Sequence, residues 1–246
     1  MKEDSQQLEE IIVIGYGAAK AKDLTAPITV VKGEALTAVP STTPMAALQG
    51  KVPGVNIVNN GAPGEGPTVQ IRGIGSFSNS KPLFVVDGMF YDNINFLNNA
   101  DIQEMSILKD ASETAQYGSR GASGVIVVTT AKGRAGFAQI EYNGLFGVNK
   151  VYKNLGMLTA DEWRAGAVAM GLSTNDMGAS TNWFEEVERS ASLTQTHNLS
   201  FTSGNDNSNL RASLGVIRRP GLLKNSSSNS YTAKVDASQY AFQKRV

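Results

Sequence analysis

The sequence of 246 residues contains no cysteine and a single histidine, His197. Without cysteine, the chain forms neither a disulfide nor a thiolate metal site, and it has no cysteine nucleophile. A single histidine excludes metal sites built on two histidines and leaves little basis for imidazole acid–base chemistry. His197 alternates with Leu199 and Phe201 on an expected strand, so we interpret it as structural. We therefore expect no metal site, no cofactor and no catalytic residue.

The sequence also lacks an excess of charge of either sign, because 22 Lys and Arg residues balance 22 Asp and Glu residues. A nucleic-acid-binding surface would need a basic excess, so we expect no nucleic-acid partner. The 25 glycines and 8 prolines are fewer than low-complexity disorder requires. The length allows one or two folded domains.

Long hydrophobic runs are missing too. The apolar runs are about four residues long, as in Ile11–Ile14, Leu83–Val86 and Val125–Val128, whereas a membrane-spanning helix needs roughly 18. The first ten residues are polar and acidic, without the apolar centre of a signal peptide. Strands that cross an outer membrane are short and alternating, so this absence does not bear on them.

The first half of the chain predicts short strands and two small helices around one core. A helix is expected at 43–50, with Thr42 or Thr43 as its N-cap and Pro44 in its first turn. A second helix is expected at 110–115, where Asp110 and Glu113 have the spacing of a capping box. The expected strands are 11–14, 28–32, 54–58, 68–72, 83–86, 102–108 and 125–130.

The pattern changes after residue 136 to segments of about ten residues with alternating polarity. We expect strands at 138–148, 194–203, 208–218 and 228–238, with a hairpin turn at 204–207. We also expect a helix at 160–170 capped by Thr159, and a shorter one at 182–190. Such alternating strands are typical of an antiparallel barrel wall.

Two short motifs suggest chemistry that their surroundings do not support. Gly15-x-Gly17 follows a strand, as in a dinucleotide site, but no amphipathic helix follows before Pro27. Ser78-x-x-Lys81 matches a pattern of penicillin-recognising enzymes, yet it lies in a polar loop and its two partner motifs are absent. We interpret both as loop sequence.

Residues 48–88 and 101–136 resemble the plug domain of TonB-dependent outer-membrane receptors, and in detail the SusC/RagA branch of that family. The similarity continues into the segments 197–204 and 210–217, which resemble early barrel strands. The motifs that carry it are Ile71-Arg72-Gly73, Val85–Gly88, Leu108–Ser112, Tyr117–Gly124 and Thr129–Gly133. The expected fold is therefore an α+β plug domain, a small mixed sheet with short helices, followed by antiparallel β-strands of an incomplete outer-membrane β-barrel.

The N-terminal arm at residues 8–17 resembles the TonB box of this family. An extended β-branched segment on an arm can add as a strand to the sheet edge of a partner. The alternative from the residues alone is a core strand of the plug domain, and the resemblance favours the box. The residues expected to bind TonB are Glu9, Glu10, Ile11, Ile12, Val13, Ile14 and Gly15.

Two arginines, Arg72 and Arg120, stand in apolar or glycine-rich surroundings and call for partners. We expect those partners among Asp87, Glu104 and carboxylates of the barrel wall; ordinary solvated arginines are the alternative. The resemblance implies that ionic contacts hold the plug in the barrel. The residues expected in plug motifs and plug–barrel contacts are Arg72, Gly73, Asp87, Gly88, Glu104, Tyr117, Gly118, Arg120 and Gly124.

The length departs from that of a whole transporter. Barrels of this class have about 22 strands, and about 110 residues follow residue 136, which suffices for about four strands and a helical or loop insertion. We therefore expect an arm at 1–20, a plug domain at 21–136 and an incomplete barrel start at 137–246.

The resemblance implies the N-terminal part of a SusC-like transporter that imports oligosaccharides or peptides across the outer membrane of a Gram-negative bacterium. Its implied partners are TonB, a SusD-like lipoprotein and outer-membrane lipid, with the plug and the arm facing the periplasm. A stand-alone plug-like module for periplasmic binding or signalling is the alternative function. A small enzyme is a third, although the sequence offers no cluster of catalytic groups.

Overall fold

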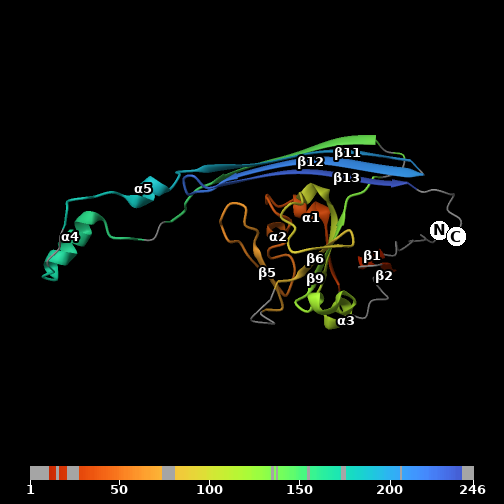
Figure 1. Cartoon of the computed structure of the whole chain (residues 1–246), viewed down its shortest axis with the longest axis horizontal. Coiled ribbons are helices and arrows are strands. Elements are labelled where there is room, and N and C mark those ends of the chain that lie inside the picture. Colours follow the sequence, from red (N-terminus) through yellow and green to blue (C-terminus); the bar gives the residue numbers. More distant parts are fainter. Residues whose placement is uncertain are drawn as a thin grey trace, which may run out of the picture.

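The computed structural model describes residues 11–14, 17–20, 28–73, 81–133, 136, 138–153, 156–172, 176–205 and 207–239. Two sheets dominate the fold (Figure 1). The first belongs to an α+β domain, residues 28–133, which we call the plug domain. The second is a long antiparallel sheet that lies across the plug domain, and we call it the wall sheet. The expected fold class, an α+β domain followed by antiparallel strands, is confirmed.

The plug domain is built on a five-stranded mixed sheet in the order β3-β8-β9-β6-β7. Only β6 and β9 pair in parallel, and the other neighbours are antiparallel. The apolar runs in β8 and β9 are almost fully buried because these strands lie inside the sheet. The bounds are β3 Thr29–Lys32, β6 Leu83–Val86, β7 Met89–Tyr91, β8 Ile102–Leu108 and β9 Val125–Thr130.

Short helices and a second small sheet complete the core of the plug domain. The expected helix at 43–50 is a single turn, α2, whose N-cap is Thr43: its hydroxyl accepts a hydrogen bond from the Ala46 amide. The strands β4 and β5 pair with each other only. The bounds are α1 Gly33–Thr37, α2 Pro44–Ala47, β4 Val55–Val58, β5 Thr68–Ile71, η2 Asn99–Asp101, α3 Ala111–Thr114 and η3 Ala115–Gly121.

The expected capping box at the start of α3 is wrong. Asp110 is the N-cap residue by its backbone, but its side chain makes no capping hydrogen bond. Its carboxylate instead lies 2.5 Å from the Arg72 guanidinium, because the turn after β5 brings that arginine to the helix start. Burial raises the pKa of the Glu113 carboxyl, and the nearby Asp110 charge raises it further.

The wall sheet has four strands in the order β10-β11-β12-β13, each paired antiparallel with its neighbours over ten or more residues. The hairpin between β11 and β12 is closed by Asn205, whose side-chain oxygen accepts hydrogen bonds from the Asn207 and Ser208 amides. Within the described residues β10 and β13 each have one neighbour, so the sheet is open. The bounds are β10 Ala138–Asn149, β11 Ser192–Gly204, β12 Ser208–Pro220 and β13 Ser227–Gln239.

A long connection between β10 and β11 carries two helices away from the rest of the molecule (Figure 1). The first, α4 (Ala160–Ala169), begins at Thr159, the cap that the sequence predicts, and Thr159 forms a complete capping box with Glu162. The second, α5 (Trp183–Val187), is shorter than the expected 182–190. Among the described helices, none has the length and hydrophobicity of a membrane span.

Near the N-terminus, β1 (Ile11–Ile14) pairs antiparallel with β2 (Gly17–Lys20) and with no other described strand. The end of the expected arm, residues 17–20, therefore forms a strand. The structure keeps β1 out of the five-stranded plug sheet, which argues against its alternative interpretation as a core strand. Glu9, Glu10 and Gly15 of the expected TonB-binding segment lie outside the described residues.

Candidate functional site

The wall sheet has an inverted polarity: its buried face is polar and its exposed face is apolar. The face turned to the plug domain buries hydroxyl, amide and guanidinium groups, among them Asn198 and Arg211. On the opposite face, side chains such as Ile140 and Val235 are about 70% exposed. The exposed apolar residues of this face are Ile140, Tyr142, Phe146, Val148, Leu193, Leu199, Phe201, Leu210, Leu214, Tyr231 and Val235. The plug–wall interface is therefore polar, and we take it as the candidate site.

A buried carboxylate, Asp101, is the centre of that interface. One of its oxygens accepts a hydrogen bond from the Arg211 guanidinium at 3.1 Å. The other oxygen accepts from the Asn198 amide and the Ser213 hydroxyl, both also at 3.1 Å. The side chains of Asp101 and Arg211 are 6% and 10% exposed. A buried charge pair with this many hydrogen bonds is satisfied, and the removal of either partner would leave a buried charge unpaired.

Local structure explains why Asp101 reaches the wall sheet. It ends η2, a short 3-10 turn that starts where the Asn98 side chain accepts a hydrogen bond from the Ala100 amide. The Asp101 carbonyl accepts from the Ala131 amide and so anchors the turn after β9. Arg211 also donates to the Ala100 carbonyl at 3.3 Å and to the Thr202 hydroxyl at 3.0 Å. Further hydrogen bonds therefore hold both ends of the ion pair in place.

A second polar contact joins the plug domain to β13. Asp87 is the first central residue of a tight β6–β7 turn, with φ of 48°, and Gly88 follows with φ of 86°. Positive φ at both central residues matches a type I′ hairpin turn, in which Asp-Gly is preferred. The Asp87 carboxylate accepts from the Thr130 amide and hydroxyl, and it lies 3.4 Å from the Lys234 ammonium. Lys234 also donates to the Thr130 hydroxyl.

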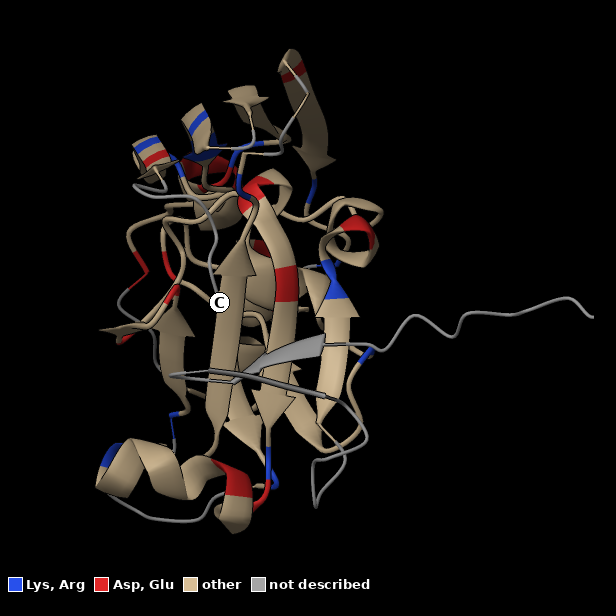
Figure 2. Ribbon diagram, turned by 90° about the vertical axis from the view of Figure 1, so that its right-hand side faces the viewer, with Lys and Arg blue, Asp and Glu red and all other residues tan. Residues whose placement is uncertain are grey.

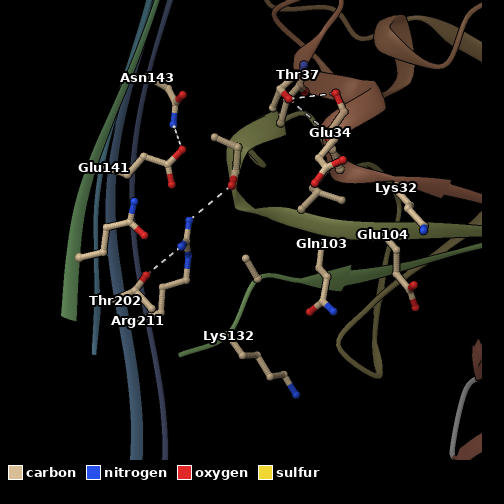
Figure 3. A pocket seen from close by; sticks show the side chains of 16 residues that line it. Lys32, Glu34, Thr37, Gln103, Glu104, Lys132, Glu141, Asn143, Thr202 and Arg211 are labelled. Atoms are coloured by element: carbon tan, nitrogen blue, oxygen red, sulfur yellow. Dashed lines mark hydrogen bonds between the residues drawn. The ribbon is translucent and has the colours of Figure 1, made fainter. Parts of the chain in front are cut away.

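A cavity of about 620 Å³ lies beside the Asp101 cluster, between α1 and β8 on one side and the wall sheet on the other (Figure 3). Its lining includes charges of both signs, such as Lys132, Glu34 and Glu141. Figure 2 shows that charged residues are sparse along most of the plug strands and gather at their ends. The cavity separates the two layers beside the Asp101 cluster, and polar contacts join them there.

The structure gives Arg72 and Arg120 partners other than the expected ones. Arg72 was expected to pair with Asp87, Glu104 or a wall carboxylate, but it pairs with Asp110 inside the plug domain. The Arg120 guanidinium lies 5.9 Å from the centre of the Phe90 ring. Glu104 lies in β8 across from Lys32 and lines the cavity. Arg72 and Arg120 thus belong to the α3 end of the plug domain.

The remaining expected residues are a buried tyrosine and three glycines of the plug domain. Tyr117 is buried and its ring meets Phe90 edge-on, with centroids 6.3 Å apart. Gly118 adopts φ 61° and ψ −151°, a conformation that is essentially restricted to glycine. A β-carbon on Gly124, whose φ is 94°, would lie 2.7 Å from the Ile71 side chain. Gly73 also has a positive φ, 87°, directly after Arg72.

The residues that make most of the plug–wall contacts are not among the site residues expected from the sequence. These residues are Asp101, Asn198, Arg211, Ser213 and Lys234, and the last four lie in strands that the sequence predicts. Arg211 and Ser213 lie opposite the apolar positions of β12, and a polar face on an expected wall strand was the available signal. No sequence signal indicated Asp101, because a single aspartate before a strand is common.

His197, the lone histidine, lies on the apolar face of the wall sheet. Its Nδ1 is 2.6 Å from the Tyr142 hydroxyl, and the Phe146 ring meets it edge-on at 5.4 Å between centroids. Over the part of the chain that the structure describes, no group of three or more metal-ligating side chains is present.

Comparison with known proteins shows which family this chain resembles. Residues 20–125 match the family described as the TonB-dependent Receptor Plug Domain. The TonB-dependent receptor SusC of Bacteroides thetaiotaomicron is 37% identical over 99% of this chain and 26% of its own length. The TonB-dependent receptor P3 of Formosa agariphila is 38% identical over 93% of this chain and 23% of its own length. The chain thus spans about a quarter of these relatives.

Solved structures agree on the fold. The RagAB peptide importer in its 'open-open' state superposes with a TM-score of 0.83 and 25% identity, over 95% of this chain and 31% of that chain. The siderophore receptor PirA from Acinetobacter baumannii matches with a TM-score of 0.52 at 16% identity, over 80% of this chain and 25% of that chain, a likeness of fold. The chain, with its plug domain and the antiparallel strands that follow, therefore belongs to the SusC/RagA-type TonB-dependent receptors.

Proposed function

We propose that this chain forms the plug and the first wall strands of a TonB-dependent importer of nutrients in the outer membrane of a Gram-negative bacterium. One observation carries the proposal: the wall sheet turns its polar face to the plug domain and its apolar face outward. A water-soluble sheet would do the opposite, whereas membrane barrels alternate apolar-out and polar-in. The relatives, which are TonB-dependent receptors, support it. The plug blocks the pore and does no chemistry on the substrate.

The lengths of the connections supply an orientation. The β11–β12 connection is a tight turn, whereas the β10–β11 connection runs over about 40 residues. Outer-membrane barrels have short turns on the periplasmic side and long loops outside. The tight turn thus marks the periplasmic end, and α4 and α5 mark the outer end. Figure 1 shows β1 and β2 at the end of the molecule away from α4 and α5, where a periplasmic partner would reach them.

The arm at β1 supplies the coupling to TonB in this proposal. It is a short β-branched strand that pairs with β2, and its other edge has no strand neighbour among the described residues. A strand of the periplasmic domain of TonB can add to that edge through main-chain hydrogen bonds. At the outer end, the long connection and the open top of the wall sheet face a SusD-like lipoprotein. The imported nutrient is an oligosaccharide or a peptide.

Calorimetric titration of the full chain with the TonB periplasmic domain tests the coupling. We expect binding by the unchanged chain and its loss in Ile12→Pro, because proline removes a backbone donor from the middle of β1. Ile12→Val keeps the donor and the strand preference, and it should bind like the unchanged chain. Equal binding by the proline variant, or no binding by the folded unchanged chain, would contradict the arm's role.

Placement of the wall sheet in lipid gives a second prediction. Leu199→Arg should weaken association with phosphatidylcholine vesicles by about 2–4 kcal/mol, the cost of a cation on the lipid-facing side of a barrel strand. Val58→Arg makes the same change on an exposed valine of the plug domain, where we expect no effect. Flotation of the two variants with vesicles in a density gradient compares them. Identical flotation would mean that the apolar face does not meet lipid.

A further inference from the structure

A second cavity, of about 790 Å³, opens at the outer end of the plug–wall interface. It lies between the plug loop 59–67 and the ends of β10, β11 and β12, so we call it the outer groove. The loop touches the wall at the far side of the groove. A β-carbon on Gly64 would lie 2.8 Å from the Ser228 hydroxyl, and one on Gly221 would lie 2.6 Å from Pro63. The volume lies within the range of small-molecule sites.

Arg219, one of the groove residues, stands out by its isolation. It lies in β12 on the same inward face as Arg211, directly across from Ser228 in β13. Its Nε is buried and has no hydrogen-bond partner, and its side chain makes no ion pair with any described residue. Arg211 on the same strand has three polar partners, the Thr202 hydroxyl, the Ala100 carbonyl and the Asp101 carboxylate. A half-buried guanidinium without an anion is costly, and an anionic ligand would offset that cost through the donors of the guanidinium.

The rest of the groove lining indicates what accompanies that anion. It includes neutral side chains that donate and accept hydrogen bonds, such as Asn59, Asn60 and Asn149, among glycines, prolines and aliphatic side chains. Lys150 adds a second cation, and Glu65 is the one carboxylate among the lining residues. No phenylalanine, tyrosine or tryptophan lines it, and few large apolar side chains do. These side chains fit a ligand with many hydroxyl groups and an acidic substituent.

We propose that the outer groove is a substrate subsite for an acidic oligosaccharide, with Arg219 binding its carboxylate. The proposal rests on the proposed function and names the substrate class of that importer. The planar guanidinium offers two parallel N–H donors to a carboxylate, which a lysine does not. The amides of Asn59, Asn60 and Asn149 each donate within the chain, and their remaining hydrogen-bonding capacity then serves sugar hydroxyls. The position at the outer end, away from the arm, is the side from which a substrate arrives.

Titration calorimetry of the full chain in detergent, with tetragalacturonate as the probe, tests this subsite. Its fully methyl-esterified form is the matched neutral probe. We expect the acid to bind at least about tenfold more tightly than the ester, as a charge-assisted bidentate contact implies. Arg219→Gln should abolish that preference by lowering the affinity for the acid to about that for the ester. Arg219→Lys should retain only part of the preference for the acid, because lysine keeps the positive charge but lacks the two parallel N–H donors of the guanidinium.

Arg218→Gln is the matched control, since it removes the same charge from the neighbouring residue on the exposed, outward face of β12. It should keep the full preference for the acid. An unchanged preference in a folded Arg219→Gln variant, or equal affinity of the unchanged chain for both probes, would overturn the proposal. A Ser/Gly tetrapeptide with a free or an amidated C-terminus is the second arm. An Arg219-dependent preference for the free peptide instead of the sugar would overturn the oligosaccharide assignment.

These outcomes stay separate from those of the proposed function. Binding of TonB depends on β1 and not on the outer groove. A chain that binds TonB through Ile12 but does not distinguish the two sugar probes would contradict the subsite alone. A chain that distinguishes the sugar probes but does not bind TonB would contradict the coupling alone.

Discussion

Replacement of Asp101 with alanine is expected to lower the free energy of unfolding by about 3–5 kcal/mol, the cost of breaking a buried ion pair by removing one partner. The variant leaves the Arg211 guanidinium buried without its anion. It also removes the acceptor for the Asn198 amide and the Ser213 hydroxyl. Urea denaturation of the chain in detergent, followed by circular dichroism, measures the change.

Two further variants separate the ion pair from general damage. Asp161→Ala breaks an ion pair with Arg164 in which the aspartate is almost fully exposed, so it should cost less than about 1 kcal/mol. The double variant Asp101→Leu, Arg211→Met replaces both charges with apolar groups, and it should recover most of the lost stability. Because Asp101 and Arg211 come from different layers, we also expect Asp101→Ala to make the 131–137 connection more sensitive to protease. Equal stability of Asp101→Ala and Asp161→Ala would contradict the role of this cluster.

Truncation of Ile126 to alanine is expected to destabilise the plug domain by about 2–5 kcal/mol. Ile126 lies in β9, between β8 and β6, and its side chain is fully buried. The lost methylene groups leave a cavity that the surrounding strands can fill only in part. Both tryptophans, Trp163 and Trp183, lie in the β10–β11 connection, so hydrogen exchange of the β8 and β9 amides is the appropriate measurement.

Val58→Ala is the matched control, because it also shortens a β-branched side chain on a plug strand, at a site that is 52% exposed. It should change amide exchange in β8 and β9 by less than about 0.5 kcal/mol. If Ile126→Ala left these amides as protected as in the unchanged chain, β9 would not be the centre of the plug core. If the β11 and β12 amides lost protection equally, plug and wall would unfold as one unit.

Patterns with a short range in sequence predicted most of the elements. The alternation in 138–148 and the three later segments placed the four wall strands, because a strand repeats every two residues and each strand keeps one face to the plug. Thr159 predicted the start of α4 through a contact that spans three residues. The predicted capping box at Asp110 is wrong because the competing partner of Asp110 is distant in the sequence. That partner, Arg72, lies 38 residues earlier in the chain, beyond the reach of any local pattern.

The sequence by itself determined the alternating strands, the α+β domain, the Asp87-Gly88 turn and the resemblance to SusC/RagA receptors, since all of these depend on neighbouring residues or on ordered motifs. Only the tertiary structure decided the plug–wall contacts. Asp101 meets Arg211 across more than 100 residues, and Lys234 reaches Asp87 across a similar span. The lack of an ion-pair partner for Arg219 among the described residues also follows only from the tertiary structure. Whether a charged side chain finds a partner within the chain depends on which layer lies opposite it. Neighbouring residues in the sequence do not determine which layer that is.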